Sequence, residues 1–290
     1  MKILVSYRAI PNAPGFATGD CVVRELRAMG HEVQVHAKQY QSDRWVENDF
    51  VPTFYGVKFD LLLYLEMNDS DPQYTELRGL KCKKVYWTFD DEMRPQWSAR
   101  FVAEMGFGRV FYASDRSVFR GRRNTSWLPY FVTPAAIAAR QNNKTRQCTI
   151  VGSPFPERVR FVEELKTLGV PVEFISGVHQ AKSLRIMAES MVTINNFPSG
   201  GSGLLVNRVW DALGVGSCLV TELQPGLSEF LCDGDRCGYV AYHNSRDCAE
   251  IVGDLLASGR WAAVARAGIE VGEKKNLAKH RLEKILEVIK

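Results

Sequence analysis

Residues 200–229 have the sequence GGSGLLVNRVWDALGVGSCLVTELQPGLSE, and this stretch decides the fold. It opens with glycines and a serine, which predict a loop whose backbone N–H groups are not obstructed by side chains. Apolar residues at four-residue spacing then predict a helix over 204–213, which Gly214 and Gly216 end. A short buried strand over 218–221 follows. Loop, helix and strand in this order form one repeating unit of an α/β fold.

The same stretch predicts a site for a nucleoside diphosphate. Unpaired N–H groups around Gly201 and Ser202 and the positive end of the helix dipole favour an anion. Arg208 suits a diphosphate, and Asp211, near the same helix face, suits the paired hydroxyls of a ribose. Glu229, beyond the next strand, is a candidate second hydroxyl acceptor. An isolated Arg/Asp pair is more often a surface ion pair, but the glycine loop, the crossover order of loop, helix and strand, and Glu229 together favour the nucleotide site.

The composition is that of a globular chain large enough for one or two domains. It has 290 residues, of which 46% are hydrophobic. The net charge of +4 permits a nucleic-acid partner without demanding one. The seven cysteines are scattered and include no CxxC pair, which favours reduced core thiols over disulfides or a zinc site. The sequence carries no metal motif, although a divalent metal ion stays compatible with it.

The sequence predicts neither secretion nor membrane insertion. The apolar run within residues 1–8 is too short for a signal peptide. No stretch approaches the ~20 apolar residues that a membrane-spanning helix needs. We therefore predict a cytoplasmic protein. We also expect it to act as a monomer.

Alternating strands and helices predict two doubly wound domains, one over 1–133 and one over 134–290. An Ala-, Asn- and Gln-rich segment at 135–147 is expected to link them, and the last helix, over 277–289, is expected to pack back on the first domain. The expected strands of the two domains span residues 2–7, 32–36, 59–65, 84–88, 109–113, 148–151, 172–176, 192–195, 218–221 and one starting at 239.

Ligands of such sheets lie beyond the carboxyl ends of the strands. Asp90 and Asp91 directly follow the strand at 84–88, and one of them is a candidate general base, with Asp91 preferred. A helix N-cap is the competing interpretation. Arg158 lies in the first turn of a later helix, where a cation opposes the helix dipole. Either an anion bound at the start of this helix or the tolerance of an exposed helix end for an unfavourable charge would explain an arginine at this position.

A basic run, SDRSVFRGRR, occupies residues 114–123 after the next strand. A solvated helix face is its default interpretation. Its place beside the strand end of Asp91 also makes it a candidate contact for an anionic acceptor such as DNA. The candidate contacts are Arg116, Arg120, Arg122 and Arg123.

Three segments resemble GT-B glycosyltransferases, and the second half is similar to the CgeB-like families. They are TIVGSPFPER at 149–158, NRVWDALG at 207–214 and the segment 222–229. The resemblance implies two Rossmann-like domains that face a cleft.

A closer resemblance is to the DNA β-glucosyltransferases of T-even phages. Residues 208–211, RVWD, are similar to that family's Arg-Val-Trp-Glu, although Asp shortens the reach toward a ribose. Gly152, Ser153 and Arg158 resemble its diphosphate loop. The strand before Asp91 resembles the one that carries its catalytic Asp. Gly19 and Asp20 fall near an acidic residue of its sugar pocket, and Asp90 is placed with them.

The resemblance implies an inverting hexosyltransferase with UDP-glucose as the default donor. Its acceptor would be the hydroxyl of a 5-hydroxymethyl pyrimidine in double-stranded phage DNA, in the host cytoplasm. One alternative is a CgeB-like glycosyltransferase that acts on a protein, a polysaccharide or a small molecule. A second alternative is a non-catalytic module that binds nucleotides or nucleic acid.

Overall fold

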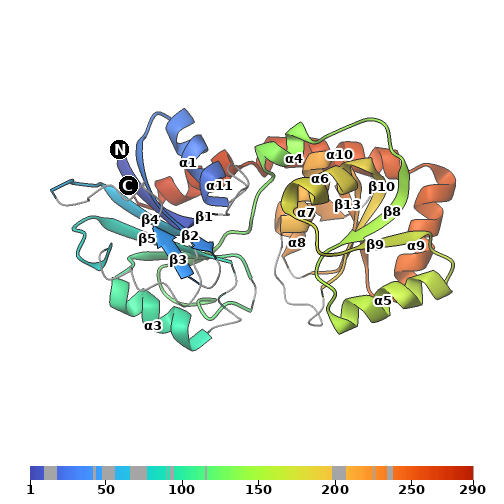
Figure 1. The fold of residues 1–290 in the computed structure, drawn as a ribbon, viewed down its shortest axis with the longest axis horizontal. Coiled ribbons are helices and arrows are strands. Elements are labelled where there is room, and N and C mark those ends of the chain that lie inside the picture. The colour runs from blue at the N-terminus through green and yellow to red at the C-terminus, as the bar shows by residue number, and fades with distance from the viewer. Residues whose placement is uncertain are drawn as a thin grey trace. The chain divides into compact units, whose positions relative to one another are not determined.

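A computed structural model gives the fold. It describes residues 1–9, 18–41, 44–47, 56–65, 77–89, 91, 95–114, 116–197, 207–224, 226–233 and 238–289. The chain divides into two compact units, Met1–Pro129 with Ala278–Lys290, and Tyr130–Leu277. Each unit has its own sheet covered by helices (Figure 1).

The first unit contains a seven-stranded sheet in the order β3-β2-β1-β4-β5-β6-β7. Its strands are β1 Lys2–Ala9, β2 Glu32–Gln41, β3 Arg44–Glu47, β4 Leu61–Leu65, β5 Lys83–Thr88, β6 Arg109–Tyr112 and β7 Thr125–Trp127. Only the β2–β3 pair is antiparallel among these strands. The continuous apolar run of β4, LLLYL, is buried along its whole length, as expected for a strand covered on both faces.

The helices of the first unit are α1 Thr18–Ala28, α3 Pro95–Met105 and α11 Ala278–Glu287. Aromatic rings hold α3 on the sheet, because Phe101 lies 5.0 Å from the Tyr64 ring and 5.5 Å from the Tyr86 ring. The C-terminal helix α11 packs against α1. Its buried Arg281 donates from Nε to the carbonyl of Pro129 at 3.2 Å, which fixes α11 to the end of this unit.

The second unit contains a six-stranded parallel sheet in the order β12-β13-β11-β10-β8-β9. Its strands are β8 Arg146–Val151, β9 Val172–Ile175, β10 Ser190–Asn195, β11 Cys218–Glu222, β12 Cys232–Asp233 and β13 Gly238–Tyr242. Its helices are α4 Pro134–Ala138, α5 Pro156–Thr167, α6 Gln180–Glu189, α7 Asn207–Val215, α8 Leu227–Phe230, α9 Ser245–Ser258 and α10 Trp261–Lys275. No helix in the described part of the chain has the length and hydropathy to cross a bilayer.

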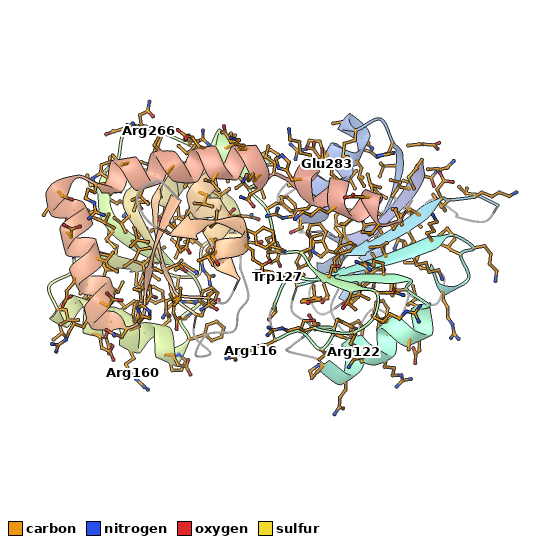
Figure 2. The ribbon with its side chains drawn as sticks, turned by 180° about the vertical axis from the view of Figure 1, so that it is seen from behind. Arg116, Arg122, Trp127, Arg160, Arg266 and Glu283 are labelled. Carbon is orange, nitrogen blue, oxygen red and sulfur yellow. The ribbon has the colours of Figure 1, made fainter. Side chains whose placement is uncertain are left out.

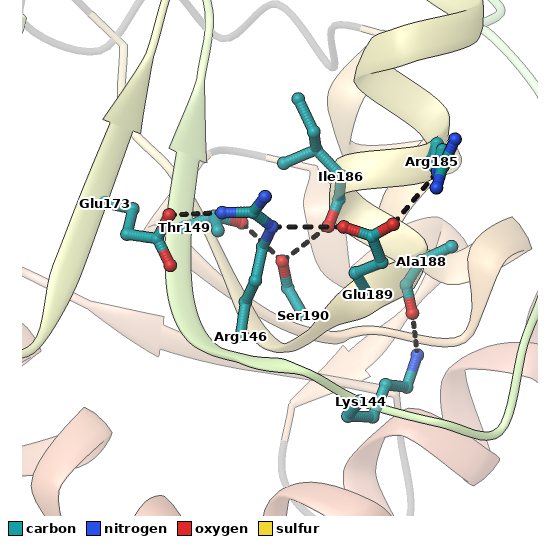
Figure 3. A network of polar contacts seen from close by, with 9 residues as sticks. All are labelled: Lys144, Arg146, Thr149, Glu173, Arg185, Ile186, Ala188, Glu189 and Ser190. Carbon is teal, nitrogen blue, oxygen red and sulfur yellow. Dashed lines mark hydrogen bonds and ion pairs between the residues drawn. The ribbon is translucent and has the colours of Figure 1, made fainter.

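A polar network ties the amino ends of the strands in the second sheet together (Figure 3). Arg146, at the start of β8, pairs with Glu173 on β9 and with Glu189 at the end of α6. Ser190, at the start of β10, exchanges a hydrogen bond with Thr149 at 2.9 Å. These contacts organise the edge opposite to the carboxyl ends of the strands.

Two sequence expectations for the second unit are wrong. Gly214 does not end its helix, because α7 continues to Val215 and Gly216, with φ 71°, ends it. A Cβ atom on Gly214 would lie 2.6 Å from the Cβ of Ala136, so glycine allows α4 and α7 to pack closely. The second wrong expectation is the linker at 135–147, which lies within the second unit and begins inside helix α4. The N-cap of α4, Thr133, accepts a hydrogen bond from the backbone N–H of Ala136.

Candidate functional site

A pocket of about 370 Å³ lies in the second unit, where the loops after β8 and β9 and the start of α7 meet. Its lining residues are Val151, Gly152, Ser153, Ser176, Gly177, Val178, Gln180, Ser183, Asn207, Arg208 and Asp211. This is the carboxyl edge of a parallel sheet, the edge where such folds place their ligands.

Two arginines converge on Gly152 at this edge. A Cβ atom built on Gly152 would lie 3.0 Å from Nη1 of Arg158 and 3.2 Å from Nη1 of Arg208. Arg158 belongs to α5, which begins directly after the Gly152 loop, and Arg208 belongs to α7. The structure therefore brings together three residues that the sequence analysis placed in one diphosphate site.

Arg158 is 1% exposed although it lies in the first turn of α5. Its Nη1 donates to the carbonyl of Ser153 at 2.7 Å and its Nη2 to the carbonyl of Asn196 at 2.9 Å. The guanidinium lies 5.7 Å from the centre of the Phe155 ring. Burial lowers the pKa of Arg158. The side chain thus folds back over the loop instead of extending into solvent, which explains how α5 tolerates a cation near its positive end.

Arg208 donates from Nε to Oδ1 of Asn195 at 3.4 Å. Burial and, to a lesser extent, the positive charge of Arg158 lower its pKa to about 10, against the opposing effect of Asp211. Among the described residues, neither guanidinium lies within ion-pair distance of a carboxylate. A buried and a half-buried arginine beside a pocket, neither paired with a carboxylate of the described residues, form a site that an anion would stabilise.

Asp211 lies one helical turn from Arg208, is 5% exposed and lines the same pocket. Burial raises the pKa of this carboxyl to about 7, even though the charge of Arg208 acts in the opposite direction. A carboxylate in this position can accept hydrogen bonds from the hydroxyls of a bound molecule. The pocket therefore offers paired donors for an anion and an acceptor for hydroxyls.

Several residues of this site were not predicted from the sequence. Ser176, Gly177, Gln180 and Ser183 follow β9 and line the pocket. Their position just past the carboxyl end of a predicted strand was the signal that pointed to them. Asn195, which holds Arg208, carried no such signal because it ends a buried strand.

Two glutamates lie at or beyond the carboxyl end of β11, Glu222 as its last residue and Glu229 on α8. Glu229 is exposed on α8 and does not line the pocket. Glu222, at the end of β11, accepts the backbone N–H of Phe197 at 3.3 Å. Burial raises the pKa of Glu222, and that hydrogen bond offsets part of the rise. Glu222 is thus the partly buried carboxylate of this segment, and Glu229 is the exposed one.

In the first unit, Asp91 lies just past β5 and is 0% exposed. Its Oδ2 accepts the Ser117 hydroxyl at 2.8 Å and the backbone N–H of Val118 at 2.9 Å. Burial raises the pKa of Asp91, and these hydrogen bonds offset part of the rise. Among the described residues, its Oδ1 has no hydrogen-bond partner. Asp91 therefore anchors the segment after β6 with one oxygen and keeps the other unused.

The basic run does not form one patch at that edge. It folds as turns rather than as a helix, and Arg116, Arg120, Arg122 and Arg123 are all exposed. Arg116 follows the carboxyl end of β6, and its N–H donates to the Ser114 hydroxyl. Arg122 and Arg123 directly precede β7, at the amino edge, and Arg122 lies apart from Arg116 (Figure 2). The physical reason is that β6 and β7 are parallel, so the run must return to the opposite edge.

Gly19 and Asp20 lie at the start of α1 against Tyr7 of β1. A Cβ on Gly19 would overlap the Tyr7 ring at 2.0 Å, and Asp20 accepts the Tyr7 hydroxyl at 2.5 Å. Burial, with Asp20 beside it, raises the pKa of Tyr7. Packing against Tyr7 therefore requires glycine at position 19, and Oδ1 of Asp20 is already engaged in a hydrogen bond with the Tyr7 hydroxyl.

Asp90, Gly201 and Ser202, which the sequence analysis also selected, lie outside the described residues. Within the described ranges, no group of three His, Cys, Asp or Glu side chains is arranged to hold a metal ion.

Comparison with known proteins gives one family and a set of similar structures. Residues 131–287 match the glycosyl transferase-like family. No curated protein matches the chain. Among solved structures, an alpha-glucosyltransferase in complex with UDP and a 13-mer DNA has a TM-score of 0.66 at 11% identity, with 100% of this chain and 99% of that chain covered.

Two further structures extend the comparison. Anabaena HepE in complex with UDP and glucose has a TM-score of 0.60 at 13% identity, and 100% of this chain and 99% of that chain are covered. A glycosyltransferase from Rickettsia africae has a TM-score of 0.63 at 9% identity, with 99% and 97% covered. The predicted GT-B fold is confirmed by these likenesses.

Proposed function

The chain belongs to the glycosyl transferase-like family and is a glycosyltransferase; we propose that it transfers a hexose from a nucleoside diphosphate sugar, with UDP-glucose as the default donor. The observation that carries this proposal is the convergence of Arg158 and Arg208 on Gly152, beside Asp211. Charge-assisted hydrogen bonds from two guanidinium groups match the oxygens of a diphosphate. The carboxylate of Asp211 matches the hydroxyls of a ribose.

The same residues suit the chemistry of sugar transfer. The bond that breaks joins the anomeric carbon to a diphosphate oxygen, and the negative charge on that oxygen grows as the bond breaks. Cations that are already in place stabilise this charge without reorganisation. Arg158 is fixed by two backbone carbonyls, and Arg208 by Asn195, so both are positioned before the donor binds.

Asp91 is the proposed general base. It would take the proton of the acceptor hydroxyl, whose oxygen then forms a bond to the anomeric carbon with inversion while the nucleoside diphosphate leaves. Its pKa, raised by burial, makes it a stronger base than an exposed Asp. Its complete burial and its bonds to Ser117 and Val118 support a structural role as well. The variants Asp91→Asn and Ser117→Ala separate these two roles.

The proposed acceptor is the hydroxyl of a 5-hydroxymethyl pyrimidine in phage DNA. The support is the DNA in the complex of a structure with the same fold, together with the exposed Arg116 past the carboxyl end of β6. An enzyme that acts on a base within a duplex has to extrude that base from the stack. The protein would then act in the host cytoplasm.

A second candidate acceptor is a protein, a polysaccharide or a small molecule, as in CgeB-like enzymes. It is favoured by the separation of the arginines, since Arg122 and Arg123 precede β7 at the amino edge of their sheet. Of the arginines in this run, Arg116 is the one that directly follows the carboxyl end of β6, the strand next to that of Asp91. A non-catalytic binding module is disfavoured by the family to which the chain belongs.

The decisive experiment is a transfer assay with the whole chain. Radiolabelled UDP-glucose, UDP-N-acetylglucosamine and GDP-mannose are each incubated with DNA that contains either 5-hydroxymethylcytosine or cytosine. The proposal predicts label on the hydroxymethylated DNA alone, from UDP-glucose. Label on neither DNA, with slow release of UDP from the donor, would reject DNA as the acceptor and retain the donor. The absence of both transfer and donor hydrolysis would reject the proposed reaction.

A further inference from the structure

We infer that Asn195 is a positioning residue that holds Arg208 in place for the diphosphate and that its neutral amide leaves the positive charge of Arg208 available. This inference rests on the proposed function, because it assigns a role within the same nucleotide site. A chain of hydrogen bonds runs from Thr221 on β11 through Asn195 on β10 to Arg208 on α7. Asn195 is 0% exposed, lies at the end of β10 and contacts Arg208, which lines the pocket.

The orientation of the amide follows from its partners. The Nε of Arg208 is a donor only, so the atom of Asn195 that faces it at 3.4 Å has to be the oxygen. The amide nitrogen then donates to the Thr221 hydroxyl at 3.0 Å. Thr221 is the register partner of Asn195 on β11. The backbone of Asn195 is fixed in addition by the Tyr242 hydroxyl, which donates to its carbonyl at 3.2 Å.

The same strand end positions the second arginine. The carbonyl of Asn196, the next residue, accepts Nη2 of Arg158 at 2.9 Å. The last residue of β10 and the residue after it therefore hold both guanidinium groups, one through a side chain and the other through a backbone carbonyl. This arrangement fixes the relative position of two like charges that otherwise repel each other, as the effect of Arg158 on the pKa of Arg208 indicates.

The neutral charge of the Asn195 side chain is the property to test, because an aspartate side chain has the same shape and differs from it mainly in charge. An aspartate at position 195 would accept from Arg208 through one oxygen and from a rotated Thr221 hydroxyl through the other, so the fold has no need to change. It would, however, pair with the cation that faces Gly152 and would repel a diphosphate. An amide holds the guanidinium without neutralising it, which is the property that an anion site needs.

The test uses Asn195→Asp in the whole chain, with UDP and uridine as probes. UDP affinity is measured by calorimetry and uridine affinity by ligand-detected NMR titration. Because the added charge acts on a diphosphate at short range, we expect UDP affinity to fall by at least about tenfold. Uridine, which lacks phosphates, should bind as it does to the wild type. The melting temperature should stay equal or rise, since the variant gives the half-buried guanidinium of Arg208 a carboxylate partner.

Thr221→Val is the second variant, and it keeps Asn195 but removes the anchor of its amide. We expect UDP affinity to fall by about threefold to tenfold, the effect of one lost positioning hydrogen bond, again without a change for uridine. This variant decides the outcome if Asn195→Asp does not fold. Equal UDP affinity in the wild type and in every folded variant overturns the inference, and so does a matching loss for uridine.

Arg208→Ala, measured in parallel, distinguishes a failure of the proposed nucleotide site from a failure of the role assigned to Asn195. If it lowers UDP affinity while the variants at positions 195 and 221 do not, the nucleotide site stands and the role of Asn195 is rejected. If Arg208→Ala leaves UDP affinity unchanged, the nucleotide site itself is misplaced.

Discussion

Arg158 and Arg208 direct their Nη1 atoms at one point above Gly152, 3.0 Å and 3.2 Å from the position that a Cβ atom would take. The two side chains come from different helices, α5 and α7, and each is held by an acceptor at the end of β10. A glycine leaves this point open. The space above Gly152 is therefore where we place an oxygen of the diphosphate.

Replacement of Gly152 by alanine tests whether this space is used. The added methyl group would contact both guanidinium groups at less than ordinary distance and would occupy the proposed oxygen position. We expect UDP affinity to fall at least about tenfold by calorimetry, as for the loss of one charge-assisted hydrogen bond. Gly253→Ala on α9 is the control, since no atom lies within 4 Å of its Cβ position. UDP affinity equal to that of the wild type in Gly152→Ala would contradict this placement.

Asp211 predicts a pH dependence of nucleotide binding. Burial raises its pKa to about 7, so in the free protein it is half protonated near neutral pH. The ionised carboxylate accepts hydrogen bonds from ribose hydroxyls more strongly than the protonated acid does, so binding is strongest above pH 7 and weakens as the pH falls through about 7. The limiting slope is about tenfold in affinity per pH unit. The titration of the diphosphate itself is measured with Asp211→Asn, in which the part due to Asp211 should disappear. A pH profile that is the same for both proteins would remove Asp211 from the site.

The same shift affects stability with the opposite sign. An Asp whose folded-state pKa lies above its unfolded value of 3.8 costs stability when it ionises. The free energy of unfolding of the free protein should therefore decrease as the pH rises from about 4 to about 7, relative to Asp211→Asn. Urea titrations at several pH values in this window measure the difference. Parallel curves for the two proteins would show that Asp211 is not desolvated.

Asp91→Asn tests the general base. Loss of a base lowers turnover by about 10²–10⁴-fold, while UDP binding should persist because its contacts belong to residues of the second unit. Ser117→Ala is the matched control, since it removes a hydrogen bond to the same carboxylate and leaves the carboxylate in place. If both variants lose stability and activity in parallel, Asp91 is an anchor of the segment after β6. Turnover close to that of the wild type in a folded Asp91→Asn would reject its role as the base.

The acceptor proposal predicts different effects for two exposed arginines of the same run. Arg116→Gln should weaken binding to hydroxymethylated DNA and reduce the slope of log affinity against log salt by about one unit. Arg122→Gln, at the opposite edge of the sheet, should leave that slope unchanged. Filter binding between low and moderate salt measures both. Equal effects for the two variants would show that DNA contacts the whole run, and the absence of both would favour a different acceptor.

The parts of this fold that the sequence predicted share one property: their pattern is local. The apolar runs of β4 and β5 and the loop between β8 and α5 can each be recognised without knowledge of their neighbours. Arg158 and Arg208 stood out for the same reason, because each lies near the start of a helix that follows a strand or a glycine loop.

The features that escaped prediction depend on distant neighbours. Helix α10 was not predicted because small residues form its buried face, and its Gly268 packs against Gly238 and Leu213, where a Cβ would lie 2.9 Å from Leu213 Cδ2. Gly214 was predicted to end its helix because glycine is common there. The structure shows that glycine is needed at this position because a Cβ atom would collide with Ala136 of α4. Asn195 looked like an ordinary end of a strand, since its partner Arg208 is 13 residues away.

The central claim is that Arg208 binds a donor diphosphate, and calorimetry with UDP on Arg208→Ala tests it most directly. The control is Arg185→Ala, which removes an exposed arginine on α6 whose only described ion pair is with Glu189. We predict that Arg208→Ala weakens UDP binding by at least about 1.5 kcal/mol, the contribution of lost charge-assisted hydrogen bonds, and that Arg185→Ala has no effect. Equal UDP affinity for the wild type and a folded Arg208→Ala would contradict the account.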